Sequence, residues 1–222
     1  MARIVLLRHA HSVANEKNLL AGRTAGIALS KTGEEQAKDL IARLGAIEFD
    51  EVAISPLQRC RETIDPWLTS TGAKSRIVVD DSISEVDYGS WSGKTLSSLR
   101  RKAQWKVVQD FPSQMIFPGG ESLLEMQGRA LSGFYRLNAV KGKGPRLIVS
   151  HGDVIKSIVA HCLGMHLDQF KRLVIEPASL TIIDTDSGTS RLVRFNDAKG
   201  FLSSEKSTNQ SALGGSTGNV TR

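Results

Sequence analysis

The residues in this sequence that are best suited to chemistry are two arginines, two histidines and a glutamate. They are Arg8, His9, Arg59, Glu85 and His151. Gathered in one pocket, such a set suits a phosphoryl group. Guanidinium groups offer planar, bidentate donors to its oxygens, and helix amino termini add backbone N–H donors. The fold has to bring these residues together, because they lie far apart along the chain.

Arg8 and His9 follow directly on a short apolar run. Residues 4–7 (IVLL) are four consecutive apolar residues, which predicts a strand in a sheet that is covered on both faces. The two residues then stand at the carboxyl edge of that sheet, where open α/β folds bind ligands. The alternative interpretation is that Arg8 and His9 only mark the solvent-exposed end of a strand.

The other candidates also follow predicted strands. Residues 51–55 form a second strand, and Arg59 comes one helical turn after it. Residues 146–150 form a later strand, followed at once by His151. Because parallel strands share one carboxyl edge, we expect these side chains to converge there.

Glu85 lies in a glycine-punctuated loop, ISEVDYGSWSG, after a third predicted strand at residues 76–80. The same argument places its carboxyl group near the common edge.

Helices are predicted between the strands. The stretch SKTGEEQAKDLIARLG indicates a helix with a capping box at Thr32 and Glu35, which ends at Gly45. A second helix is predicted behind Ser55 as its N-cap, with Pro56 at the first position. We expect Pro66 to kink or end that helix.

The end of the chain indicates a hairpin. A helix after residue 151 is expected to stop at Gly164, and two alternating runs, 179–184 and 190–195, then flank the turn residues 186–188. The predicted fold is therefore α/β: a three-layer α/β/α arrangement with a mostly parallel central sheet and a C-terminal antiparallel edge hairpin.

Composition is that of an ordinary globular chain, with 222 residues, 40% hydrophobic and 23% charged. We expect one domain over residues 1–198 and a flexible Ser/Gly/Thr-rich tail over 199–222. No window resembles a membrane helix or a secretory signal. Cys60 and Cys162 give neither a disulfide framework nor a metal-ligand spacing, so a cytoplasmic location is expected.

A net charge of +6 favours anionic partners. The basic residues are scattered and few aromatics lie among them, which disfavours nucleic-acid binding, and a small anionic substrate explains the charge equally well. The composition leaves a homodimer open.

Two histidines and a glutamate could instead bind a metal ion. The flanking arginines argue against this interpretation, because fixed cations would repel a divalent ion, and no His-x-x-x-His or Cys-x-x-Cys spacing is present. We therefore expect no metal.

Five ordered motifs now identify a family resemblance. The segments LLRHAHSVAN, SPLQRCRET, SEVDYGSWSG, FPGGES and VSHGDVIKSI together resemble the histidine phosphatase superfamily, also called the phosphoglycerate mutase-like family. A single Arg-His pair would carry little weight, whereas five motifs in the expected order and context are specific. The resemblance runs over residues 3–163.

The resemblance implies a role for each of the five candidates. His9 would be the nucleophile that forms a phosphohistidine, which requires a neutral imidazole. Arg8, Arg59 and His151 would hold the phosphoryl oxygens and offset charge in the transition state. Glu85 would protonate the leaving oxygen and then activate water.

Further substrate-binding candidates are Asn15, Ser12, Gly22 and Tyr88. Asn15 matches a polar position of the first motif, whereas Tyr88 either lines the mouth of the site or packs its loop down. Residues 90–120 form the expected lid, with Trp105 taken as packing.

One residue departs from the family pattern. The first motif of the family reads Arg-His-Gly, and here the third residue is Ala10. Its methyl group could narrow the pocket or restrict the backbone.

The resemblance favours a phosphatase of histidine acid phosphatase type that needs no cofactor and acts on a small phosphate ester. The runner-up is a mutase, which would use 2,3-bisphosphoglycerate. Mutases resemble one another in a long insertion with an arginine pair for the substrate carboxylate, whereas here the stretch from Glu85 to His151 is short and Arg100 and Arg101 lie too near Glu85. A second alternative is a non-catalytic phosphate- or nucleotide-binding module.

Overall fold

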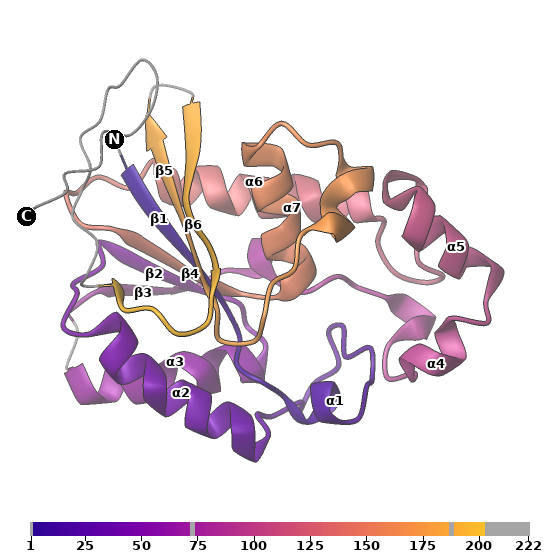
Figure 1. Ribbon diagram of the computed structural model, residues 1–222, viewed down its shortest axis with the longest axis horizontal. Coiled ribbons are helices and arrows are strands. Elements are labelled where there is room, and N and C mark those ends of the chain that lie inside the picture. Colours follow the sequence, from indigo (N-terminus) through magenta and orange to yellow (C-terminus); the bar gives the residue numbers. More distant parts are fainter. Residues whose placement is uncertain (1, 72–73, 187–188, 203–222) are drawn as a thin grey trace, which may run out of the picture.

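The computed structural model describes residues 2–71, 74–186 and 189–202. Within these ranges, strands form a six-stranded sheet in the order β3-β2-β4-β1-β5-β6 (Figure 1). Their bounds are β1 (Ala2–Arg8), β2 (Glu51–Ile54), β3 (Arg76–Val79), β4 (Arg146–Ser150), β5 (Leu180–Asp186) and β6 (Thr189–Asp197).

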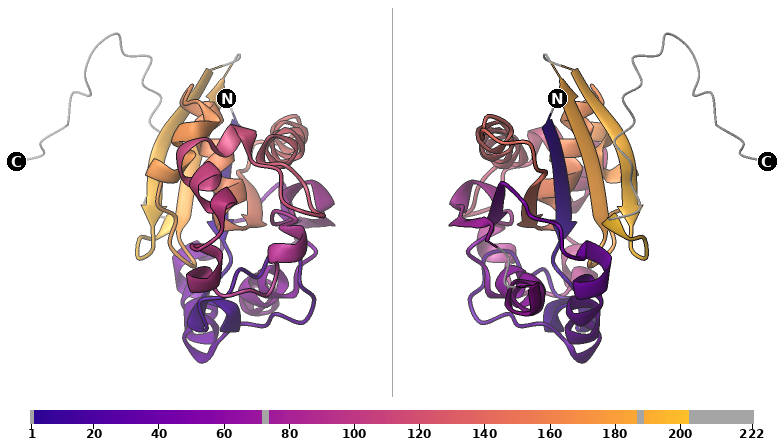
Figure 2. Two further views of the ribbon diagram at one scale, coloured as in Figure 1. Left: turned by 90° about the vertical axis from the view of Figure 1, so that its right-hand side faces the viewer. Right: turned by 90° about the vertical axis from the view of Figure 1, so that its left-hand side faces the viewer.

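Helices cover both faces of this sheet. On one side lie α2 (Lys31–Leu44) and α3 (Gln58–Thr71), and on the other lie α6 (Leu123–Asn138) and α7 (Gly152–Cys162) (Figures 1 and 2). The remaining helices are short and lie in connections: α1 (Val13–Glu16), α4 (Leu96–Leu99), α5 (Ala103–Asp110) and the 3₁₀-helices η1 (Asp81–Ile83), η2 (Gly89–Trp91), η3 (Pro112–Gln114) and η4 (Leu167–Arg172). The predicted three-layer α/β fold is confirmed.

The pairing of the strands also agrees with the prediction. β1 and β2 each run parallel to β4, and β3 runs parallel to β2. β5 pairs antiparallel with β1 and β6 pairs antiparallel with β5, which gives the expected edge hairpin. Of the predicted turn, residues 187 and 188 lie outside the described residues, as does the predicted tail from residue 203 onward.

The apolar run at residues 4–7 is explained by burial on both faces. Ile4 and Leu6 belong to the core that β1 shares with α6 and α7, whereas Val5 and Leu7 belong to the core on the side of α2 and α3. Successive side chains of a strand point to opposite faces, so a strand between two helical layers needs apolar residues at every position. This burial fixes the end of β1, and with it the position of His9.

The predicted start of the first long helix was wrong. Ser30 is the N-cap of α2, because its backbone is extended and its Oγ accepts a hydrogen bond from the Gly33 N–H at 3.2 Å. Thr32 already lies inside the helix.

The predicted N-cap of the second long helix was wrong, and of the two alternatives for Pro66 the structure excludes the end of the helix. α3 begins at Gln58, and the Ser55 hydroxyl contacts a histidine at the sheet edge. Pro66 lies inside α3, which continues to Thr71. The next residue, Trp67, is fully buried and donates its indole N–H to the Gly45 carbonyl at 2.8 Å. Burial of this large side chain offsets the cost of about 3 kcal/mol for proline in a helix.

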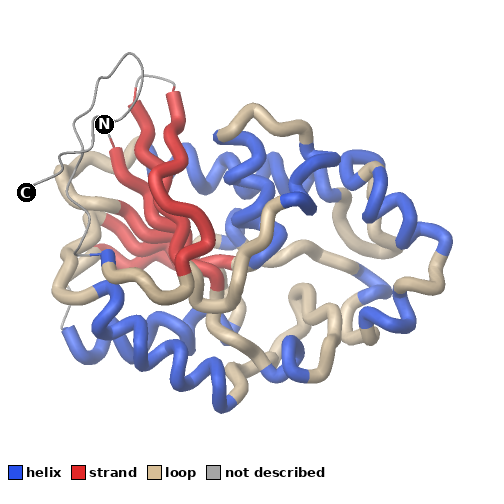
Figure 3. The backbone as a smooth tube through the Cα atoms, viewed as in Figure 1, coloured by secondary structure: helices blue, strands red, loops and turns tan. Residues whose placement is uncertain are grey.

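A segment without strands lies beyond the carboxyl ends of β1, β2 and β4. It comprises η2, α4, α5 and η3 with their connecting loops, and projects away from the sheet (Figure 3). The expected lid, residues 90–120, falls in this segment. Among the helices in the described ranges, none has the length and apolar character needed to cross a bilayer.

Candidate active site

The ends of three neighbouring strands bring the predicted residues together. Arg8 pairs with Ser150 and Ile54 pairs with Val149, so β1, β4 and β2 end side by side. The backbone N–H of His9 donates to the Ser150 carbonyl at 2.8 Å. The rings of His9 and His151 then lie edge to face, with centroids 5.2 Å apart.

His9 is held as a neutral imidazole with a defined tautomer. Its side chain is buried, and Nδ1 lies 2.7 Å from the Ala10 carbonyl. A carbonyl can only accept, so Nδ1 carries the proton and Nε2 keeps its lone pair. Burial, together with the charges of Arg59 and Arg8, lowers the pKa of His9 well below its usual value. The ring is therefore uncharged at neutral pH, with a lone pair on Nε2.

Arg59 and Arg8 bring buried N–H donors that lack acceptors. Nη2 of Arg59 donates to the Gly22 carbonyl at 2.9 Å and to Nδ1 of His151 at 3.1 Å. Nε and Nη1 of Arg59 have no hydrogen-bond partner among the described residues, and neither has Nε of Arg8. Buried unpaired donors are costly, so their clustering at one end of a cavity indicates an anion site.

His151 contacts Arg59 on the side away from the cavity. It is fully buried, and it is not among the residues that line the cavity. Because Arg59 can only donate to Nδ1, Nε2 carries the proton and donates to Ser55 Oγ at 2.7 Å. Burial and the nearby Arg59 lower the pKa of His151 well below its usual value. In this geometry the ring orients Arg59.

Glu85 supplies the carboxyl group. Oε1 accepts a hydrogen bond from the Val86 N–H at 3.0 Å, and the side chain lines the cavity. Burial, together with the negative charge of Asp153, raises the pKa of Glu85 to about 7. A carboxyl with this pKa can both give and take a proton near neutral pH.

Two arginines that the sequence analysis did not single out hold the Glu85 loop. The Glu85 carbonyl accepts from Nε of Arg23 at 2.9 Å and from Nη2 of Arg129 at 3.0 Å. Arg129 also donates to the carbonyls of Ser82 and Ser84. The Glu121 carboxylate binds both arginines. The ES of the PGGES motif therefore joins helix α6 to this loop, a link that spacing along the chain does not reveal.

Asp153 is a further residue that sequence reasoning missed. It lies in the first turn of α7 and lines the cavity. Its carboxylate accepts from the Tyr88 hydroxyl at 2.8 Å and from Lys156 Nζ at 3.2 Å. Burial opposes ionisation, but Lys156 and the Tyr88 hydroxyl outweigh it and lower the pKa of Asp153. The sequence feature that could have identified Asp153 is its position two residues after His151.

Arg8, His9, Arg59, Glu85 and Asp153 line one cavity of about 380 Å³. We call the part around Arg8, His9, Asn15, Arg59 and Glu85 the inner end. Leu19, Leu20, Leu96, Trp105 and Val108 form what we call the outer end.

The weaker candidates for substrate binding, Asn15, Ser12, Gly22 and Tyr88, all line the cavity. Asn15 Oδ1 accepts from the backbone and hydroxyl of Ser12, at 3.0 and 2.9 Å. This leaves the amide NH₂ of Asn15 as its donor group. Gly22 has φ +52°, and a Cβ there would lie 2.8 Å from Ser92 Oγ and 3.0 Å from the Tyr88 ring. Glycine therefore allows the chain to approach the inner end closely.

Ala10 does not narrow the pocket. Its side chain is fully buried in a small cluster with Leu29, Ala37 and Ala178, and it does not line the cavity. Its N–H donates to Thr63 Oγ1 at 2.9 Å. Ala10 is not among the residues of positive φ, so the backbone accepts alanine without strain.

The remaining candidates of the sequence analysis have different positions relative to the site. Among the described residues, no group of three or more His, Cys, Asp or Glu side chains is arranged to hold a metal ion. Trp67 is a core residue, whereas Trp91 and Trp105 line the cavity. His11 contacts Ser30, and His161 pairs with Tyr135 on the surface.

The family model of the histidine phosphatase superfamily, branch 1, matches residues 4–198. The chain belongs to this superfamily. This match does not test the narrower prediction of histidine acid phosphatase type.

Relatives in the superfamily have both of the activities that the motifs suggested. The chain is 27% identical to a phosphoserine phosphatase of Hydrogenobacter thermophilus, over 88% of this chain and 92% of that protein. It is 29% identical to a 2,3-bisphosphoglycerate-dependent phosphoglycerate mutase of Cytophaga hutchinsonii, over 88% and 89%.

Solved structures support the fold. The alpha-ribazole phosphatase of Shigella flexneri superimposes with a TM-score of 0.79 over 89% of this chain and 98% of that chain, at 23% identity. At this identity the likeness concerns the fold alone.

Proposed function

We propose that this protein is a phosphomonoester hydrolase that acts on a small phosphorylated metabolite through a phosphohistidine. The observation that carries the proposal is the inner end itself. Unpartnered guanidinium donors of Arg8 and Arg59 lie beside an uncharged His9, and Glu85 has a pKa of about 7. A phosphoryl group supplies the acceptors that these donors lack.

The reaction has two steps. In the first, Nε2 of His9 attacks phosphorus, the P–O ester bond breaks, and Glu85 gives its proton to the leaving oxygen. In the second, the Glu85 carboxylate takes a proton from water as the water oxygen attacks phosphorus. The P–N bond breaks and phosphate leaves. Arg8 and Arg59 bind the phosphoryl oxygens in both steps, and Asn15 adds an amide donor.

The lining of the cavity favours hydrolysis over mutase chemistry. A mutase must also hold the carboxylate of a bound acid. Arg100 and Arg101 do not line the main cavity, and they border a separate hollow beside α5. Mutase transfer remains the second candidate, supported by the similarity to the Cytophaga hutchinsonii enzyme.

The third hypothesis is a non-catalytic phosphate-binding module. This hypothesis does not explain the neutral His9 or the raised pKa of Glu85, because phosphate binding alone needs neither.

The experiment is phosphate release from p-nitrophenyl phosphate and a panel of metabolite phosphates, with EDTA present. Turnover under these conditions, with an acid-labile phosphoenzyme trapped by rapid quenching, is the expected result. If 3-phosphoglycerate is converted to 2-phosphoglycerate in the presence of 2,3-bisphosphoglycerate while no ester is hydrolysed, the protein is a mutase. Binding of phosphate esters without either reaction would indicate the binding module.

A further inference from the structure

The outer end of the cavity has a different chemistry from the inner end. Its side chains are apolar and half-buried, and they come from the loop after α1, from α4 and from α5. They are Leu19, Leu20, Leu96, Trp105 and Val108. With the phosphoryl group of the proposed substrate at the inner end, its alcohol part has to lie in the rest of the cavity, which this surface lines.

Aromatic packing gives this surface a fixed shape. The rings of Trp105 and Trp91 are stacked, with centroids 6.4 Å apart and planes 18° apart. Trp91 in turn meets Phe117 edge to face at 5.4 Å. Trp91 and Phe117 are almost fully buried, so Trp105 stands on a rigid base while its own side chain remains half-buried.

The charged groups that line the same region already have partners. Lys156 Nζ lies 3.2 Å from the Asp153 carboxylate and 5.8 Å from the centre of the Phe170 ring. Lys171 Nζ lies 4.0 Å from the Asp110 carboxylate. The arginines that line the cavity, Arg8 and Arg59, lie at its inner end.

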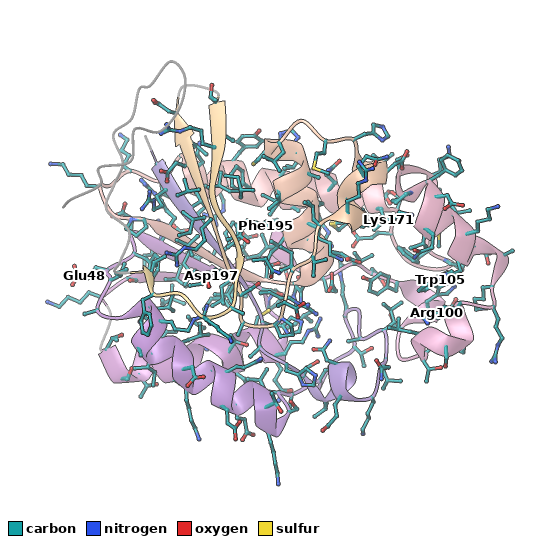
Figure 4. All side chains as sticks on the ribbon, viewed as in Figure 1. Glu48, Arg100, Trp105, Lys171, Phe195 and Asp197 are labelled. Atoms are coloured by element: carbon teal, nitrogen blue, oxygen red, sulfur yellow. The ribbon has the colours of Figure 1, made fainter. Side chains whose placement is uncertain are left out.

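We infer that the alcohol released from the substrate is apolar and carries a ring, and that Trp105 is the residue that selects it. This inference rests on the proposed hydrolase activity. Figure 4 shows Trp105 on α5, at the end of the molecule beyond the sheet, with Lys171 on the neighbouring segment. A ring that stacks on Trp105 leaves water, whereas the arginines that line this cavity, Arg8 and Arg59, lie at its inner end and do not offer a carboxylate a partner beside Trp105.

The test compares three phosphates of primary alcohols, so that the leaving oxygens are chemically similar. They are 2-phenylethyl phosphate, ethyl phosphate and the phosphate ester of 3-hydroxypropionate. We expect kcat/KM for the phenylethyl ester to exceed that for the ethyl ester by about 10-fold or more, since burial of a ring contributes on this scale. The carboxylate ester should be no better than the ethyl ester.

Variants separate selection from folding. Trp105→Ala should lower kcat/KM for the phenylethyl ester far more than kcat/KM for the ethyl ester and so remove most of the preference, and Trp105→Phe should keep most of the preference. Gln104→Ala, on an exposed neighbour in the same helix, is the matched control and should change neither value.

The outcomes distinguish the two proposals. Hydrolysis of all three esters without a preference for the ring overturns the inference and leaves the proposed function standing. Preference for the carboxylate ester that disappears in Lys171→Ala also overturns it, because a second anionic group would then be the recognised feature. Failure to hydrolyse any ester removes the proposed function and the inference with it.

Discussion

The two ends of the cavity are built in different ways. The inner end has Arg8 at the end of β1, His9 directly after it and Arg59 in the first turn of α3, and the ends of β1, β2 and β4 are held side by side by strand pairing. The outer end comes from short helices and loops, and α5 has no fully buried residue. The inner end therefore holds charged groups in a fixed geometry, and the outer end offers a replaceable apolar surface. We therefore expect the reaction to depend on the sheet and the choice of substrate to depend on the segments beyond it.

The largest effect should come from His9. Replacement His9→Ala removes the proposed nucleophile while leaving the unpartnered donors of Arg8 and Arg59 in place. We expect kcat for p-nitrophenyl phosphate to fall by about 10⁴-fold or more. Inorganic phosphate should still bind, as measured by calorimetry.

Substantial turnover by His9→Ala would contradict the view that the inner end of the cavity carries out the reaction. The reaction would then not pass through this histidine, whatever the geometry of the strand ends.

Glu85 should show an effect that depends on the leaving group. Glu85→Gln removes the proposed proton donor, so kcat for ethyl phosphate should fall by about 10²- to 10⁴-fold. The loss should be much smaller for p-nitrophenyl phosphate, because p-nitrophenolate leaves without a proton. Equal losses on the two esters would mean that Glu85 acts by position or charge and not as a general acid.

The pH dependence gives a second measure of Glu85. The first step needs the protonated carboxyl, whose pKa is about 7, so kcat/KM for ethyl phosphate should fall as the pH rises through that value. The negative charge of Asp153 helps to raise this pKa. Asp153→Asn should therefore move the falling limb to lower pH, and an unmoved limb would assign it to another group.

Sequence reasoning was effective where strand ends decide position. The apolar run at residues 4–7 correctly predicted a strand that is buried on both faces. The prediction succeeds because Ile4 and Val5 pack into cores on opposite faces of the sheet, so both positions require apolar residues. The convergence of His9, Arg59 and His151 then follows from parallel pairing.

Sequence reasoning was less effective for side-chain contacts between residues of different helices and loops. Arg129 lies on α6, and nothing in its sequence surroundings indicates that it donates to the Glu85 carbonyl. Trp105 was taken as lid packing, although it lines the cavity, because a half-buried aromatic residue in a short helix has the same pattern in either role. The placement of His151 behind Arg59 was also beyond the reach of sequence, since it depends on which ring nitrogen meets which donor.

A positioning effect is expected for Arg129, which joins α6 to the Glu85 loop. Arg129→Lys cannot reproduce the hydrogen bonds to the Ser84 and Glu85 carbonyls and to Glu121, because a lysine has one charged nitrogen. Displacement of the Glu85 loop should lower kcat by about 10-fold with little change in KM, since misplaced catalytic groups cost rate more than binding.

Arg136→Lys is the matched control for Arg129. Arg136 lies on the same helix and binds the carboxylates of Glu51 and Asp80, away from the cavity. It should lower Tm without lowering kcat. Equal losses of activity in the two variants would show that α6 acts only through overall stability.

The smallest effect should come from the residue at which this chain departs from its family. Ala10→Gly restores the family pattern, yet the Ala10 side chain packs against Leu29, Ala37 and Ala178 and not into the cavity. We expect kcat/KM to stay within about 3-fold on every ester, and the free energy of unfolding to fall by about 1 kcal/mol, because a buried methyl is lost and the unfolded chain gains freedom. Urea denaturation and steady-state kinetics measure the two quantities. A change in the order of preference among esters would contradict this expectation, since it would mean that the backbone beside the nucleophile, and not the outer end alone, decides which alcohol is accepted.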